Sequence, residues 1–207
     1  MNVDLIAEII SRIILVVIAV VGHEIAHGYA ALYEGDTTAR DAGRLTLNVF
    51  AHIDPFMSVI LPGLLLLTGS PILFGAAKPV PVNPYRFRHG EWGDVLVSAA
   101  GPGANLAMAA VLGALGTLVP AFHLIGYAGV LINVVLAVFN LLPIPPLDGS
   151  RIIAPFLPPR WRWQWHRLDQ YGFLFLFMVL FFFNGILWRA IGPVIDALVA
   201  VFTWRMF

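Results

Sequence analysis

Long apolar runs separated by short polar segments dominate this chain, and they predict membrane-spanning helices. The first run predicts a helix over about Leu5–Tyr33, roughly 43 Å long at 1.5 Å per residue, more than a hydrocarbon core of ~30 Å needs. Further spans are predicted over Asp94–Leu118, Phe122–Leu142 and Tyr171–Leu187, and a last short helix over Ile191–Trp204.

Three other segments depart from this helical pattern. Arg44–Phe50 alternates apolar and polar residues, which predicts a short strand. Residues 56–74 are apolar but interrupted by prolines and glycines, so they form either a short span or a re-entrant hairpin. Residues 78–84 contain three prolines, which exclude a helix and predict an extended segment.

Composition places the chain among membrane proteins. Apolar residues make up 59% of its 207 residues and charged residues 12%, against about 25% charged in soluble domains. Twelve basic and twelve acidic residues balance, so no nucleic-acid partner is indicated, and the absence of cysteine excludes disulfides and thiolate ligands. No small-residue cleavage site precedes residue 23, which argues against a removable signal peptide. We expect one membrane-embedded domain over 1–207.

Near the end of the first predicted helix lies the sequence His-Glu-Ile-Ala-His, residues 23–27. Histidines four apart share one helix face, so His23 and His27 can bind one Zn²⁺ while Glu24 acts on a water held there. Such groups are costly at membrane depth and are functional candidates by default. The two histidines leave at least one protein ligand to be found, because catalytic zinc usually has three.

The missing ligand should be a His, Asp or Glu on a neighbouring element. The later spans and their ends offer few of these: Asp94, His123, Asp148, Asp169 and Asp196. Asp148 follows a proline-rich break that places it on irregular backbone, which at membrane depth must line protein or a wet cavity. An Asp-Gly turn at the membrane surface explains it equally well. We expect His123 to lie at the membrane interface. His52 and His89 are predicted to be surface residues in loops.

Several motifs in this order resemble the site-2 protease family of intramembrane zinc metalloproteases, in its compact bacterial and archaeal branch. They are HEIAH (23–27), GRLTLN (43–48), HIDP (52–55), AKPVPVNP (77–84), GPGAN (101–105) and NLLPIPPLDG (140–149). The resemblance implies His23, His27 and Asp148 as ligands of one zinc ion per chain, with Glu24 as catalytic acid/base. It also implies substrates whose transmembrane helices are cut within the bilayer. Compared with longer members, we expect neither a PDZ nor a CBS-type module in this chain, and no separate span before the His-Glu-Ile-Ala-His helix.

Two asparagines lie within the predicted spans. Asn105 and Asn140 either hydrogen-bond between helices, which is common in membrane bundles, or contact the substrate backbone or the oxyanion. The functional interpretation is the stronger for Asn140, because it lies close to Asp148 in sequence. For Asn105 the two interpretations are equally supported.

The distribution of Lys and Arg predicts the orientation. Loops 75–93 and 143–170 carry three and four of them, which places both in the cytoplasm. If Asp148 meets the histidines, residues 34–55 are cytoplasmic too, and 56–74 is then re-entrant with the N-terminus outside. Residues 160–167 are rich in arginine and tryptophan. We expect them to lie at the membrane interface and to contact anionic lipid headgroups.

The sequence thus predicts an all-α polytopic membrane protein, a bundle of about 4–6 transmembrane helices with a re-entrant segment and short β-like elements near the active site. Its catalytic core spans about 5–151 and its C-terminal membrane helices about 171–204. The predicted function is an intramembrane zinc metalloprotease of the cell membrane, opening toward the cytoplasm, with transmembrane proteins as substrates. The alternatives are a membrane zinc peptidase for other substrates, such as signal-peptide remnants, and a zinc-binding or transport protein. The oligomeric state is left open.

Overall fold

The computed structural model describes residues 3–60, 63, 64, 67, 68, 77–204 and 206, and every regular element within them is helical. Four of the described helices are long and apolar enough to cross a membrane. These are α1 (Val3–Tyr33), α4 (Glu91–Leu118), α5 (His123–Asn140) preceded by η4 (Pro120–Phe122), and α9 (Asn184–Thr203). The predicted all-helical architecture is confirmed, and the four apolar helices fit a polytopic membrane protein.

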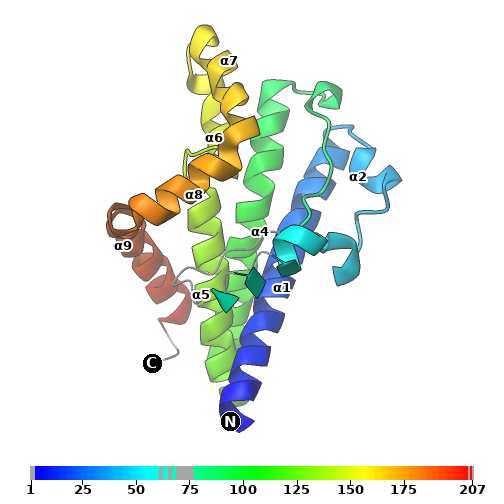
Figure 1. The fold of residues 1–207 in the computed structure, drawn as a ribbon. Coiled ribbons are helices and arrows are strands. Elements are labelled where there is room, and N and C mark those ends of the chain that lie inside the picture. The colour runs from blue at the N-terminus through cyan, green and yellow to red at the C-terminus, as the bar shows by residue number, and fades with distance from the viewer. Residues whose placement is uncertain (1–2, 61–62, 65–66, 69–76, 205, 207) are drawn as a thin grey trace.

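Helix α4 runs through the middle of the bundle, packed against α1 on one side and α5 on the other (Figure 1). Glycines let α4 and α5 approach closely. A Cβ added to Gly126 would lie only 2.9 Å from the Cα of Gly116, so the two backbones touch, as small residues allow in membrane bundles. On its far side α5 packs against α9 through buried valines and isoleucines. The bundle thereby fixes α4 beside the His-Glu-Ile-Ala-His turn of α1.

The C-terminal helices break at a different place from the predicted one. The sequence predicts a span over Tyr171–Leu187, but α8 (Gly172–Phe182) ends earlier and α9 begins at Asn184. Asn184 and Gly185 have poor helix propensity, which favours a break there. With 11 residues, α8 is about 16 Å long, roughly half of what a span needs. The helix of this region that is long and apolar enough to span a membrane is α9, and the short helix predicted over Ile191–Trp204 is its second half.

Three short helices follow α1: α2 (Thr38–Asp41), η1 (Val49–His52) and the π-helical η2 (Pro55–Ile60). The strand predicted over Arg44–Phe50 is wrong. The Asn48 side chain accepts a hydrogen bond from the Phe50 N–H and starts η1, and the Thr46 carbonyl binds His52 Nε2 at 2.8 Å. Local side chains therefore satisfy the backbone groups that a strand would pair. The surface position predicted for His52 is also wrong, because this residue is 2% exposed.

The segment predicted to be re-entrant, residues 56–74, falls largely outside the described residues. Its described beginning is the end of η2, followed by Gly63, Leu64, Leu67 and Thr68. The re-entrant hairpin stays a prediction.

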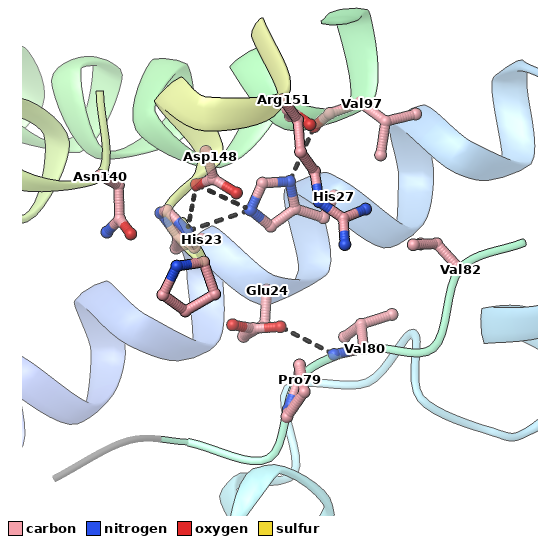
Figure 2. A pocket seen from close by; sticks show the side chains of 12 residues that line it. His23, Glu24, His27, Pro79, Val80, Val82, Val97, Asn140, Asp148 and Arg151 are labelled. Atoms are coloured by element: carbon pink, nitrogen blue, oxygen red, sulfur yellow. Dashed lines mark hydrogen bonds and ion pairs between the residues drawn. The ribbon is translucent and has the colours of Figure 1, made fainter. Parts of the chain in front are cut away.

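Residues 77–83, named the strap below, contain no helix and run in an extended path past Pro79 and Val82 (Figure 2), as predicted for 78–84 except that Pro84 begins a short helix. The strap then enters η3 (Pro84–Arg86). The guanidinium of Arg44 donates to the carbonyl oxygens of Lys78 and Pro79 at 2.7 and 3.3 Å. The N–H of Lys78 donates to the carbonyl of His52 at 2.9 Å. These bonds fix one end of the strap against the segment that follows α1.

A buried carboxylate holds the other end of the strap. Asp36 is fully buried just past the end of α1 and accepts hydrogen bonds from the N–H groups of Asn83 at 2.6 Å and Thr38 at 3.0 Å. Burial by itself raises the pKa of Asp36, but hydrogen bonds from Thr38 and Asn83 and the charge of Arg86 outweigh it and lower the pKa below its ordinary value. The ionised carboxylate therefore ties the strap to the end of α1.

After α5 the chain turns and forms four further elements before α8: α6 (Asp148–Ile153), η5 (Ala154–Phe156), α7 (Pro159–Leu168) and η6 (Asp169–Tyr171). Helices α2, α6 and α7 lie toward the end of the bundle where α1 finishes, and the N-terminus lies at the opposite end (Figure 1). The irregular parts of the chain thus gather around the C-terminal half of α1.

Candidate metal centre

The two histidines of α1 lie four residues apart and point into the bundle from one helix face. His23 and His27 are 7% and 9% exposed, and their Nε2 atoms are 3.0 Å apart. Their rings stand nearly perpendicular, at 84°. Both Nε2 atoms therefore face one small volume, as the sequence spacing predicts.

Asp148 reaches the same volume from a segment distant in sequence. Its Oδ2 lies 3.2 Å from His23 Nε2 and 3.3 Å from His27 Nε2 (Figure 2). The tight turn before α6 delivers it, and Gly149 makes that turn possible. A Cβ on Gly149 would lie 2.2 Å from the carbonyl oxygen of Leu141. The structure thus brings together His23, His27 and Asp148, the three residues that the sequence proposes as ligands.

The hydrogen bond made by Nδ1 of each ring determines whether the Nε2 atom facing Asp148 carries a proton. His23 Nδ1 lies 2.6 Å from Asn105 Oδ1, and His27 Nδ1 lies 2.7 Å from the carbonyl oxygen of Val97. Both partners are acceptors, so each Nδ1 carries the proton and donates it. A neutral imidazole with Nδ1 protonated has a bare lone pair at Nε2. Two such lone pairs and a carboxylate oxygen therefore converge, an arrangement that is repulsive without a cation.

These distances fit zinc. Ligand atoms at about 2.05 Å from a tetrahedral Zn²⁺ are about 3.3 Å apart, and the three separations here are 3.0, 3.2 and 3.3 Å. Two histidines and one carboxylate leave a fourth position open, as in catalytic zinc sites.

Asn105 occupies a buried position behind His23. It is fully buried on α4, where its Oδ1 accepts the His23 proton and its Nδ2 donates to Asn133 Oδ1 at 2.9 Å and to the Ala19 carbonyl at 3.2 Å. All of these partners lie on α1 and α5. Asn105 therefore hydrogen-bonds between three helices, the first of the two roles considered from sequence, and it orients the ring of His23; contact with the substrate stays a prediction.

We expect Asn105→Ala to weaken zinc binding by about 10- to 100-fold, the usual effect of removing a group that orients a metal ligand. His23 would lose its acceptor and with it the fixed tautomer, and Asn133 would lose a buried donor. Competition with a zinc-sensitive dye measures the effect. Asn140→Ala serves as a control, since Asn140 donates its hydrogen bond to the Leu136 carbonyl of its own helix; equal zinc affinity in Asn105→Ala and wild type would show that Asn105 has no such role.

Glu24 lies between the metal ligands and the strap. Its Oε2 accepts a hydrogen bond from the N–H of Val80 at 2.8 Å, as Figure 2 shows. Together with Pro79, Val80 and the three ligands it lines a cavity of about 240 Å³. A carboxylate in this place can reach a water molecule in the cavity and exchange protons with it.

Asn140 also lines this cavity, at the end of α5. Its Nδ2 donates to the carbonyl oxygen of Leu136 at 3.0 Å, which leaves Oδ1 as an acceptor toward the cavity. Contact with the substrate stays a prediction for this residue. His89 lies outside the cavity: its side chain is 67% exposed, as predicted, and pairs with Glu34 at 3.0 Å.

Sequence reasoning missed several residues of the centre. The Val97 carbonyl leaves no signal in the sequence, because every residue has one. Gly101 packs against the Nε2 atoms of the two histidines, and a Cβ there would lie 2.4 Å from His27 Nε2. Its position within the GPGAN motif could have indicated this. Arg151 lines the cavity as well, and its place three residues after Asp148, on the same helix face, could have indicated this.

Comparison with known proteins agrees with this chemistry. The sequence profile of peptidase family M50 matches residues 118–183. The chain is 37% identical over 206 residues to "Putative zinc metalloprotease YwhC" of Bacillus subtilis (strain 168), covering 92% of this chain and 90% of that protein. It is 34% identical over 166 residues to "Putative zinc metalloprotease Rip2" of Mycolicibacterium smegmatis, and 35% over 164 residues to the Mycobacterium tuberculosis (H37Rv) protein of the same name. It spans 61% of the length of each Rip2 protein. No solved structure gives a significant match.

Proposed function

This chain belongs to peptidase family M50, the site-2 protease family, and we propose that it is an HExxH-type zinc endopeptidase that cuts peptide bonds within or next to transmembrane helices of other proteins. One zinc ion per chain would be held by His23, His27 and Asp148. The observation that carries the proposal is the convergence of these ligands with Glu24 around one cavity, on a helix long and apolar enough to span a membrane.

The residues of the cavity can perform hydrolysis. Zinc, when bound, supplies a Lewis acid that polarises the scissile carbonyl and lowers the pKa of a bound water toward about 7. Glu24 takes a proton from the attacking water and gives it to the leaving nitrogen. The carbon–nitrogen bond then breaks, which leaves a carboxylate on one product and an amine on the other. The Val80 N–H holds Glu24 in place, and the buried site keeps out excess water.

A transmembrane helix is protected from cleavage while its carbonyls are in intrahelical bonds, so the substrate must be extended locally. The strap supplies an extended backbone beside the cavity, lined there by Pro79, Val80 and Val82. We propose that the unwound substrate segment lies along the strap, as in strand addition. The 44–50 segment, also considered for this role, is irregular and starts a helix, so the strap is the better candidate.

We propose a multi-pass location in the cell membrane with the active site open to the cytoplasm. Basic residues support this orientation, because Arg44, Lys78 and Arg86 lie in the segments around the C-terminal end of α1. By the positive-inside rule such loops face the cytoplasm. Water would then enter the cavity from that side, and the N-terminus would lie outside.

A zinc transporter or a zinc-binding protein is the alternative function. A transport path through the membrane needs several metal-binding stations along the spans. Within the described residues, one group of His, Asp and Glu side chains could hold a metal ion. A single site with an adjacent carboxylate base favours the enzyme.

Co-expression with a panel of tagged single-span membrane proteins tests the function. Wild type should convert at least one of them to shorter products. Glu24→Gln should cleave that protein about 10²- to 10⁴-fold more slowly, because the proton acceptor is lost. No product should then be detected in the time in which wild type cleaves it. Zinc content should stay at the wild-type level, since Glu24 is not a ligand. Equal processing by the two proteins would refute the protease assignment.

A further inference from the structure

We propose that Arg151 is a substrate-binding residue, whose guanidinium donates hydrogen bonds to a main-chain carbonyl of the extended substrate segment next to the scissile bond. This proposal rests on the proposed function and adds a contact to it. Arg151 lies on α6, three residues after Asp148, and lines the same cavity as Glu24 and His27. Among the described residues that line this cavity, it is the one Lys or Arg.

The donors of Arg151 are largely unused. Its Nη1 lies 3.7 Å from Asp94 Oδ1 and its Nη2 lies 4.0 Å from Asp169 Oδ2, so both ion pairs are longer than hydrogen bonds. Within the described part of the chain the guanidinium makes no hydrogen bond, and 36% of its side chain is exposed. A guanidinium presents five N–H donors, so most of them are available to a ligand in the cavity.

An unwound helix creates the need for such donors. Each carbonyl released from its intrahelical bond is costly in a water-poor site unless another donor replaces the lost one. The other polar side chains of the cavity offer fewer donors, and Ser98 has a single hydroxyl. Asn140 donates to its own helix, and the Nδ1 protons of His23 and His27 point away into α4. Arg151 therefore provides the richest set of donors for substrate carbonyls.

The protein contains an internal example of this contact. Arg44 donates to two consecutive carbonyls of the extended strap, those of Lys78 and Pro79. In Figure 2 the Arg151 side chain descends from α6 past His27 toward the strap side of the cavity. A second extended segment, running between α6 and the strap, would meet the Arg151 guanidinium as the strap meets that of Arg44.

Two other interpretations use the same residue. Arg151 could clamp α6 to α4 and η6 through Asp94 and Asp169, and thereby position Asp148. Its guanidinium could also select an acidic side chain, because a carboxylate and a main-chain carbonyl share the same acceptor chemistry. Each interpretation predicts a different response to substitution, so binding measurements separate them.

The test measures binding in the Glu24→Gln background, where substrate is not consumed. The probe is a fluorescein-labelled peptide spanning the cut of the first panel protein that wild type cleaves, and the readout is its dissociation constant. We expect Arg151→Met to raise this constant about 10- to 100-fold, as for a lost hydrogen bond to a charged group. Zinc content should be unchanged, and Arg151→Lys should restore part of the affinity.

Thioamide substitution identifies the partner, because a thiocarbonyl is a weaker acceptor. At one position beside the cut it should weaken binding when Arg151 is present and have no further effect in Arg151→Met, a non-additivity typical of direct contact. Equal thioamide effects in both proteins would overturn the proposal. So would zinc loss in Arg151→Met, a matching defect in Asp169→Asn, or dependence on an acidic residue of the peptide. If wild type cleaves no panel protein, the proposed function itself fails.

Discussion

Replacing Gly101 with alanine should remove zinc from the protein and abolish cleavage. The added Cβ would lie 2.4 Å from His27 Nε2 and 2.7 Å from His23 Nε2, the two atoms that face the metal position. The rings cannot retreat easily, because each is bonded through Nδ1 to α4. We expect zinc affinity to fall by more than the ~100-fold seen for changes around a ligand, since here both ligands are displaced.

Gly103→Ala is a matched control for this experiment. Gly103 lies on the same helix, and the substitution adds the same methyl group, but nothing lies within 4 Å of its Cβ position. Gly103→Ala should therefore keep wild-type zinc content and activity. Metal analysis of the purified proteins, together with cleavage of a panel substrate, measures both effects. A Gly101→Ala protein that retains tightly bound zinc would show that the histidines do not bind the metal through Nε2.

Asp148→Asn should have opposite effects on the protein with and without zinc. Without the metal, Asp148 Oδ2 is buried and lacks a hydrogen-bond partner within the described residues, and it faces the bare Nε2 atoms of two histidines. An amide in its place can donate to one of them, so we expect Asp148→Asn to be as stable as wild type, or more stable, in the presence of a chelator. Replacing a functional group often raises the stability of a protein while it lowers its activity.

With zinc the order should reverse. A ligand that binds only the folded state stabilises it by about 4 kcal/mol at a free concentration of roughly 1,000 times its dissociation constant. Wild type should therefore gain thermal stability on zinc addition, and Asp148→Asn should gain little and cleave nothing. Asp169→Asn, which removes a carboxylate outside the cavity, should respond to zinc like wild type. A full zinc response in Asp148→Asn would mean that another residue completes the ligand set.

Local sequence signals predicted most of the fold and the two histidine ligands, whereas Asp148 was singled out by the family resemblance. Apolar runs long enough to span a membrane predicted α1, α4 and α5, because such runs have few alternatives in a bilayer. The exception is the boundary at Asn184, where one apolar stretch contains two helices. Alternation over residues 44–50 was misleading, since that pattern is equally compatible with a turn whose polar side chains bond to the backbone.

The groups that orient the ligands required the tertiary structure. Asn105 was visible as a buried amide, but its partner His23 is 82 positions away along the chain and becomes a neighbour only because α4 packs on α1. The Val97 carbonyl and the free donors of Arg151 depend on where α4 and α6 lie. Residue type and spacing report chemistry along one helix face, whereas contacts between helices follow from packing.

The ligand set is split between the first helix and a residue that follows the next two described spans, and this has a consequence for biosynthesis. His23 and His27 enter the membrane early, but the centre remains incomplete until α4 and α5 are inserted and the turn before Gly149 has folded back. The metal centre that the proposed hydrolysis needs would therefore be complete only at a late stage of assembly.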